Sequence, residues 1–293
     1  MFVFFTNPFS IALYGFLSVA VVALWLRPTI GLLLGFVAVV LAFYLGYLSG
    51  LGTTWLLIMS LLSMTYPLYK KPSWIKLVHA LGIFAGCYLF YLHLMPGVYN
   101  PLMLSGVRLS AGSWPYHSYL NVDKIFLSIV LLATCIRLNS RKQDWCDTFG
   151  FSSVWGPVVL LVTVLMGLGL FLGYVRFDAK IPTILWLWVP TNLLFVCVAE
   201  EALCRGFLQK ELGSWFKNMQ VGHWPAIGIG ALAFGGLHYY GGPIYILLST
   251  IAGMGYGYAY FKSKRLESAI AVHFLVNLTH ILFFSYPALR ALG

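Results

Sequence analysis

Apolar runs of about 20 residues, separated by short polar connections, dominate this sequence of 293 residues. Hydrophobic residues make up 60% of the chain and charged residues only 9%, whereas an average soluble domain is roughly 25% charged. A soluble core cannot bury so much apolar surface, so the runs are interpreted as membrane spans. The same composition excludes a disordered chain, a coiled coil and a secreted disulfide scaffold.

The runs predict an all-α fold, a polytopic transmembrane helical bundle of about ten spans. The first run is interpreted as an uncleaved span, because no Lys or Arg precedes it and no clear small-residue cleavage site follows it. The expected spans are residues 9–26, 29–49, 51–69, 74–95, 124–138, 154–175, 183–209, 224–240, 243–261 and 266–286.

The basic residues divide unevenly between the two sets of connections. Those in or beside the odd-numbered connections are Arg27, Lys70, Lys71, Lys76, Arg137, Arg141, Lys142, Lys210, Lys217, Lys262, Lys264 and Arg265. Those in the even connections and the C-terminus are Arg108, Lys124, Arg176, Lys180 and Arg290. Because Lys and Arg collect in cytoplasmic connections, we expect the odd connections in the cytoplasm and both termini outside. The basic excess is thereby explained without a nucleic-acid partner.

The connection 96–123 is long and rich in Pro, Gly and aromatic residues. Loops of this length are usually functional or disordered, and the aromatics favour a lid or a short re-entrant piece at the outer interface. Every candidate catalytic residue follows the loop Asn139–Ser153. We therefore divide the chain into accessory transmembrane helices of unknown role at 1–150 and a core at 151–293.

The seventh span carries Glu200, Glu201 and Arg205 inside an apolar helix. Each such group costs about 2.5 to 3.5 kcal/mol at the centre of a membrane helix, which indicates a function. Glu201 and Arg205 are four residues apart and can pair, while Glu200 points about 100° away and is free to face a cavity. The other six carboxylates are expected to be solvated loop or interface residues; they are Asp123, Asp144, Asp147, Asp178, Glu211 and Glu267.

Two further spans add His238 on one helix, and His273 with Asn277 on one face of another. Glycines before His238 would let neighbouring helices approach closely. Together these residues suffice to activate a water and to donate hydrogen bonds to an oxyanion. Helix rise places the set in the cytoplasmic half of the membrane.

Simpler roles are expected for the remaining histidines and for the cysteines. The former divide into helix–helix hydrogen-bond partners, His79, His93 and His280, and interfacial residues, His117 and His223. The cysteines are expected to be small buried thiols; they are Cys87, Cys135, Cys146, Cys197 and Cys204. No cofactor is expected, although Cys197, Glu200 and Cys204 share a helix face that leaves a zinc site with the two histidines open.

Three motifs occur in order on successive helices: Glu-Glu-x-x-x-Arg (200–205), Phe-x-x-x-His (234–238) and His-x-x-x-Asn (273–277). Together they resemble the CPBP intramembrane proteases, which include the type II CAAX prenyl endopeptidases of the Ras-converting-enzyme kind and bacteriocin-processing proteins. The resemblance implies that Glu200 and His238 orient and deprotonate a water. It also implies that His273 and Asn277 form the oxyanion hole.

The same resemblance implies that Glu201, paired with Arg205, shapes the site, with Phe234 in support. The function expected is an intramembrane endopeptidase that cleaves a membrane-anchored protein, whether or not that protein is prenylated. The expected location is a multi-pass membrane protein, in the cytoplasmic membrane if the source is bacterial. Two alternatives stay open: a proton-coupled transporter that uses the same acid and histidine cluster, and a non-catalytic immunity or interaction protein.

Overall fold

The computed structural model describes residues 3–70, 73–136, 138, 148–217, 219 and 221–290. Its helices are α1 (Pro8–Leu26), α2 (Pro28–Tyr44), α3 (Gly50–Thr65), α4 (Trp74–Tyr91), α5 (Val122–Thr134), α7 (Gly156–Phe171), α8 (Leu185–Thr191), α9 (Val198–Glu201), α10 (Lys210–Trp215), α11 (His223–Gly236), α12 (Gly242–Ser263) and α13 (Leu266–Phe283). Its strands are β1 (Leu102–Val107) and β2 (Tyr116–Tyr119).

The predicted all-α class is confirmed, and the ten apolar runs each overlap a helix. Among the described residues, six helices are long and apolar enough to cross a membrane; the number of spans therefore stays a prediction. Several helices end earlier than expected because the backbone turns left-handed after them. Gly46, His93 and Gly173 have φ values of 76°, 57° and 66°, which a helix cannot continue.

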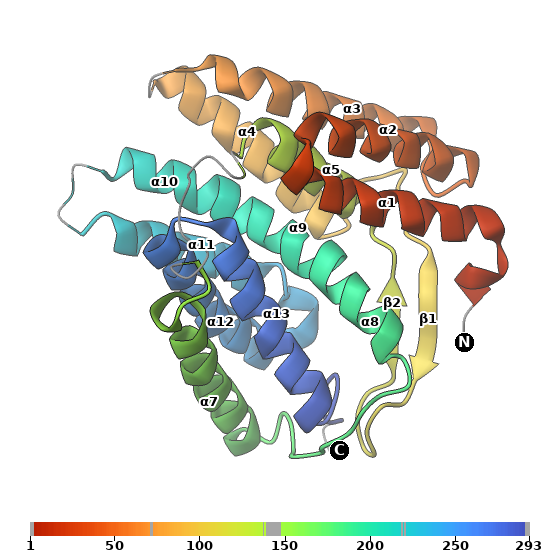
Figure 1. Cartoon of the computed structure of the whole chain (residues 1–293), viewed down its shortest axis with the longest axis vertical. Helices are drawn as coiled ribbons and strands as arrows, with labels where there is room; N and C mark the ends of the chain where they lie inside the picture. The colour runs from red at the N-terminus through yellow and green to blue at the C-terminus, as the bar shows by residue number, and fades with distance from the viewer. Residues whose placement is uncertain are drawn as a thin grey trace.

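One long helix divides the molecule into two groups of helices (Figure 1). It runs through α8, α9 and α10, joined by π-helical turns at Asn192–Cys197 and Ala202–Gln209. One hydrophobic core packs α1 to α5 against this helix, and a second packs α7, α11, α12 and α13 together. Both clusters include residues of the long helix, and its central residues Glu200, Glu201 and Arg205 are buried.

Two helices are too short to cross the bundle. With 13 and 14 residues, α5 and α11 extend about 20 Å, against roughly 30 Å for a hydrocarbon core. The N-terminal end of α5 and the C-terminal end of α11 both lie near the middle of the long helix, where Lys124 and His238 approach Glu200. Because these helices are short, their ends, with Lys124 and His238, lie in the interior of the bundle.

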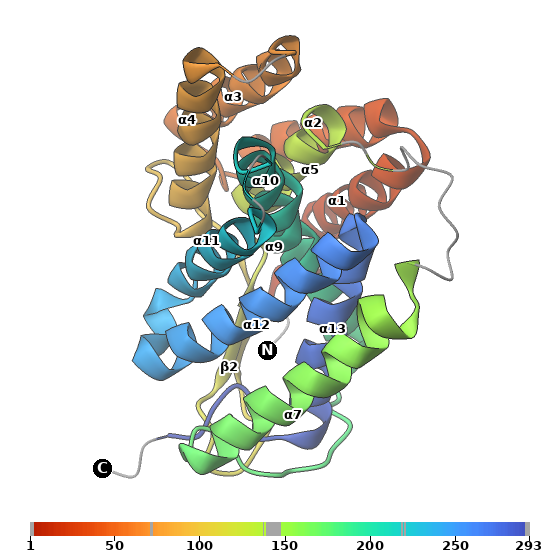
Figure 2. The same cartoon turned by 90° about the vertical axis from the view of Figure 1, so that its left-hand side faces the viewer.

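The connection 96–123 forms a two-stranded antiparallel sheet with an irregular register. The pairs are Leu102 with Tyr119, Leu104 with Ser118 and Val107 with Tyr116. The expectation of a re-entrant piece is therefore replaced by a β-hairpin. The hairpin lies alongside the bundle, and its turn lies at the end of the bundle where α13 finishes (Figures 1 and 2).

Several predicted features lie outside the described residues: Lys71, Arg137, Arg141, Lys142, Asp144, Cys146, Asp147 and part of the loop Asn139–Ser153. The division at residue 150 stays a prediction. Residues on both sides of it share one core, in which Ile129 and Leu132 cluster with Ala199 and Leu203.

Candidate active site

A cavity of about 680 Å³ lies between the long helix and the group α7, α11, α12 and α13. Four of the residues expected in the site, Glu200, His238, His273 and Asn277, line it. They come from α9, the end of α11 and α13, so the structure brings together three segments that are separate in sequence.

Glu200 occupies the centre of the site and is 5% exposed. Its Oε1 accepts a hydrogen bond of 2.5 Å from Lys124 Nζ. Its Oε2 is buried without a hydrogen-bond partner and lies 4.0 Å from His238 Nε2 and 3.9 Å from His273 Nε2. One carboxylate oxygen is therefore held by a cation, and the other faces two imidazoles.

Lys124 lies in the candidate site but was not predicted from the sequence. It was assigned to an outer connection, but it is 7% exposed and lies in the first turn of α5. Its Nζ also lies 5.1 Å from the centre of the Tyr91 ring. Glu200 was expected to be free of a charged partner, and this is corrected. Spacing along one helix reveals only partners on that helix, whereas Lys124 comes from α5. The signal in the sequence was a lysine directly before an apolar run.

His238 is positioned by the C-terminal end of α11, the helix that it follows. Its Nδ1 lies 2.8 Å from the carbonyl of Phe234. A carbonyl only accepts, so this nitrogen carries the hydrogen and Nε2 is left as the acceptor in the neutral ring. Gly235 permits this placement, because a Cβ there would lie 3.0 Å from the carbonyl of Ile246. The predicted close approach of helices at these glycines is confirmed at this position.

Glu201 forms the predicted pair with Arg205. Glu201 Oε1 accepts from Arg205 Nη1 at 3.1 Å and from His273 Nδ1 at 2.9 Å. Arg205 also donates from Nη2 to the carbonyl of Gly253 on α12. The contact with Glu201 orients the His273 ring so that its Nε2 faces Glu200.

Aromatic rings enclose these polar groups. Phe234 lies 4.7 Å from the Arg205 guanidinium and 5.4 Å from the His273 ring. Tyr256, which the sequence analysis did not single out, stacks on His273 at 4.5 Å with an interplanar angle of 15°. The rings leave the imidazole few alternative orientations and exclude water from the ion pair behind it.

Asn277 contacts a second residue that was missed. Its Nδ2 donates to Asn192 Oδ1 at 3.3 Å, and the Cys197 thiol donates to the same oxygen at 3.3 Å. Asn192 and Cys197 are the ends of a π-helical turn, a feature that frequently marks functional sites. Asn192 was detectable as an amide within an apolar run.

Some of the carboxylates that were expected to be solvated are instead buried or ion-paired. Asp123 is buried and accepts from Asn100 Nδ2 at 3.0 Å, which corrects its assignment as a solvated residue. Glu211 and Glu267 are ion-paired with Lys76 and Arg265, both at 3.1 Å. These acids lie at helix ends, where a neighbouring chain segment covers them.

The remaining histidines and the thiols divide as follows. His79 bonds the carbonyl of Leu62 on α3 at 2.9 Å, as a helix–helix partner should. His93 instead contacts Asn100 in its own loop, and His280 contacts the carbonyl of Ser285 just beyond its helix and lines the cavity. The predicted burial of thiols is confirmed for Cys87, Cys197 and Cys204; Cys135 is partly buried. No group of three or more His, Cys, Asp or Glu within the described residues is arranged to hold a metal.

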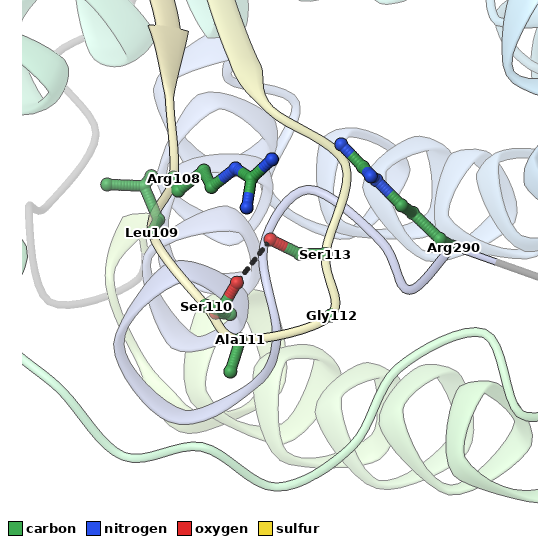
Figure 3. A pocket seen from close by; sticks show the side chains of 7 residues that line it. All are labelled: Arg108, Leu109, Ser110, Ala111, Gly112, Ser113 and Arg290. Carbon is green, nitrogen blue, oxygen red and sulfur yellow. Dashed lines mark hydrogen bonds between the residues drawn. The ribbon is translucent and has the colours of Figure 1, made fainter.

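The cavity reaches the end of the bundle formed by the even connections. Its lining there includes Trp114 and Tyr116 of the hairpin, Tyr174, Tyr240 and Leu289. A smaller cavity of about 270 Å³ lies beside this mouth, over the turn 110–113 (Figure 3). The guanidinium groups of Arg108 and Arg290 both extend into it (Figure 3).

Comparison with known proteins finds a family model that matches the segment containing the site. Residues 182–279 match the family model of the type II CAAX prenyl endopeptidase Rce1-like proteins. No curated protein and no solved structure matches the chain. The matched segment begins just before α8, ends within α13 and contains all three sequence motifs. This segment, about a third of the chain, is therefore similar to the Rce1-like type II CAAX prenyl endopeptidases.

Proposed function

We propose that the protein hydrolyses a peptide bond of a membrane-associated protein with a water held between Glu200 and His238. The observation that supports this is the unpartnered Glu200 Oε2, which is buried 4.0 Å from His238 Nε2 at the wall of the cavity. A water oxygen about 2.8 Å from both atoms fits that separation. Such a water can donate one proton to each of the two acceptors.

The proton path follows from the hydrogen bonds of the imidazole. His238 donates from Nδ1 to the Phe234 carbonyl, so Nε2 receives the proton of the attacking water. The imidazolium that forms is stabilised by the adjacent Glu200 carboxylate. The same Nε2 then returns the proton to the leaving amine, which restores the enzyme.

The developing oxyanion would be stabilised by His273 and Asn277. With Nδ1 donating to Glu201, His273 donates from Nε2 only as an imidazolium. Two carboxylates and two cations, Lys124 and Arg205, otherwise balance at the site. The extra positive charge is then matched by the oxyanion in the transition state.

Lys124 has a positioning role in this proposal. Its hydrogen bond to Oε1 keeps Glu200 ionised and aims Oε2 at the water. The proposed chemistry uses no cofactor, because the carboxylate and imidazole supply the base and the proton donor.

The test compares Glu200→Gln and His238→Ala with the wild type by mapping new protein termini in membrane fractions. General-base catalysis is worth about 10² to 10⁴ in rate, so both variants should insert normally and lose cleavage. Normal processing by the Glu200→Gln protein would contradict the mechanism. Substrate flux in proteoliposomes that depends on a proton gradient would favour the transporter instead.

A further inference from the structure

The connections between helices form two distinct ends of the bundle. At one end, backbone hydrogen bonds tie the even connections together: Trp114 donates to Ala288 and Leu289 donates to Tyr174, both at 2.9 Å. At the other end, Lys76 at the start of α4 pairs with Glu211 of α10. Figures 1 and 2 both place the hairpin tip and the C-terminal ends of α7 and α13 at the first of these ends.

The catalytic cavity opens at the end that holds the hairpin and the C-terminal segment. Tyr116, Tyr240 and Tyr286 line it there. Within the described part of the chain, its lining includes no residue from the connections 66–73, 210–222 or 262–265 at the opposite end. The path from Glu200 therefore leads to one end of the bundle.

Charge identifies which side of the membrane this end faces. The sequence has twelve Lys and Arg in or beside the odd connections, against five in the even connections and the C-terminus. Eight of the twelve belong to the described residues, and these lie at the end opposite the cavity. Two bases at each end are ion-paired: Lys124 with Glu200 and Lys180 with Asp178 at the cavity end, and Lys76 with Glu211 and Arg265 with Glu267 at the opposite end. A bias of this size toward one set of short connections orients them to the cytoplasm.

We infer that the catalytic cavity opens to the non-cytoplasmic side of the membrane. The inference rests on the proposed function and names its substrate class: a membrane-anchored polypeptide whose scissile bond lies outside the cytoplasm. A prenylated C-terminus displayed in the cytoplasm would face the end of the bundle at which the cavity of Glu200 does not open. Because Trp114, Tyr174 and Tyr286 form the entrance, the chemistry of the mouth suits an extended segment with apolar side chains next to a membrane anchor.

The orientation can be measured without catalysis. Tyr240→Cys places a thiol at the cavity mouth, where the side chain is 67% exposed, and Met219→Cys places one at the opposite end, where it is 52% exposed. Both are made in the Glu200→Gln protein, expressed in a bacterial cytoplasmic membrane and treated with a membrane-impermeant maleimide. The chain without either added cysteine measures background from the native thiols.

The expected result is equal labelling of Tyr240→Cys in intact and lysed cells, and labelling of Met219→Cys only after lysis. The reverse pattern, or labelling of both in intact cells, overturns the inference. In the wild-type protein, new termini that depend on Glu200 should map to non-cytoplasmic segments of membrane proteins. Cytoplasmic termini would also overturn the inference. The expected labelling with no Glu200-dependent cleavage would instead overturn the proposed function and leave the orientation established.

Discussion

At the scale of single residues, the site contains buried charges that neutralise one another in pairs. Glu201 is paired with Arg205 of its own helix, whereas Glu200 is paired with Lys124 from α5. Removing one member of a buried pair leaves an uncompensated charge and typically costs about 3 to 5 kcal/mol. Loss of one partner from either pair should therefore destabilise the fold.

Lys124→Met should lower both stability and cleavage, because Glu200 then takes up a proton to avoid a buried unpaired charge. The double variant Lys124→Met with Glu200→Gln should recover thermal stability in detergent but not activity. Lys76→Met, which breaks the ion pair with Glu211 at the opposite end, is the matched control and should keep cleavage. Full activity of Lys124→Met would exclude the positioning role.

Asn277→Ala should lower kcat about 10²- to 10³-fold with little change in KM, because an oxyanion donor acts mainly in the transition state. The control is Thr279→Ala on the same helix, whose hydroxyl donates only to the carbonyl of Leu275. Steady-state kinetics on a processed substrate measure both values. An equal rise in KM would assign Asn277 to substrate binding instead.

At the scale of elements, helix length and close helix contacts place the imidazole. α11 ends inside the bundle, and His238 follows its last turn. The helix is held against α12 at Gly235, where a Cβ would lie 2.0 Å from Thr250 Oγ1 and 3.0 Å from the Ile246 carbonyl. The hydroxyl can rotate away, but the backbone carbonyl cannot.

Gly235→Val should therefore separate α11 from α12, destabilise the protein by about 1 to 3 kcal/mol and displace His238. Gly228→Ala on the same helix is the control, since a Cβ there meets no atom within 4 Å. Thermal unfolding in detergent and cleavage assays measure the two effects. If both variants were equally stable and active, the helix contact would not position His238.

At the scale of the whole molecule, the first five helices contribute to the site as well as to the bundle. They share a hydrophobic core with the long helix, and α5 supplies Lys124. Tyr91 of α4 donates to the carbonyl of Ala199 at 2.8 Å, next to Glu200. We therefore propose that residues 1–150 support the Glu200 carboxylate from the side opposite the cavity.

Residues 151–293 expressed alone should be unstable and inactive, because Glu200 would lack its cation and the long helix would lose one packed face. Co-expression of 1–150 with 151–293 should restore cleavage, since the two parts bury a common core. Yield in the membrane and terminal mapping provide the readouts. Activity of 151–293 alone would show that the N-terminal helices are dispensable.

The membrane class, the helices and the set of Glu200, His238, His273 and Asn277 follow from the sequence alone. They depend on composition and on helical spacing, which act locally along the chain. The pairing of Glu200 with Lys124 and the protonated nitrogen of His238 needed the tertiary structure. The end of the bundle at which the cavity opens also needed the tertiary structure. Contacts between distant segments determine which helices pack together and where the ends of the short helices lie.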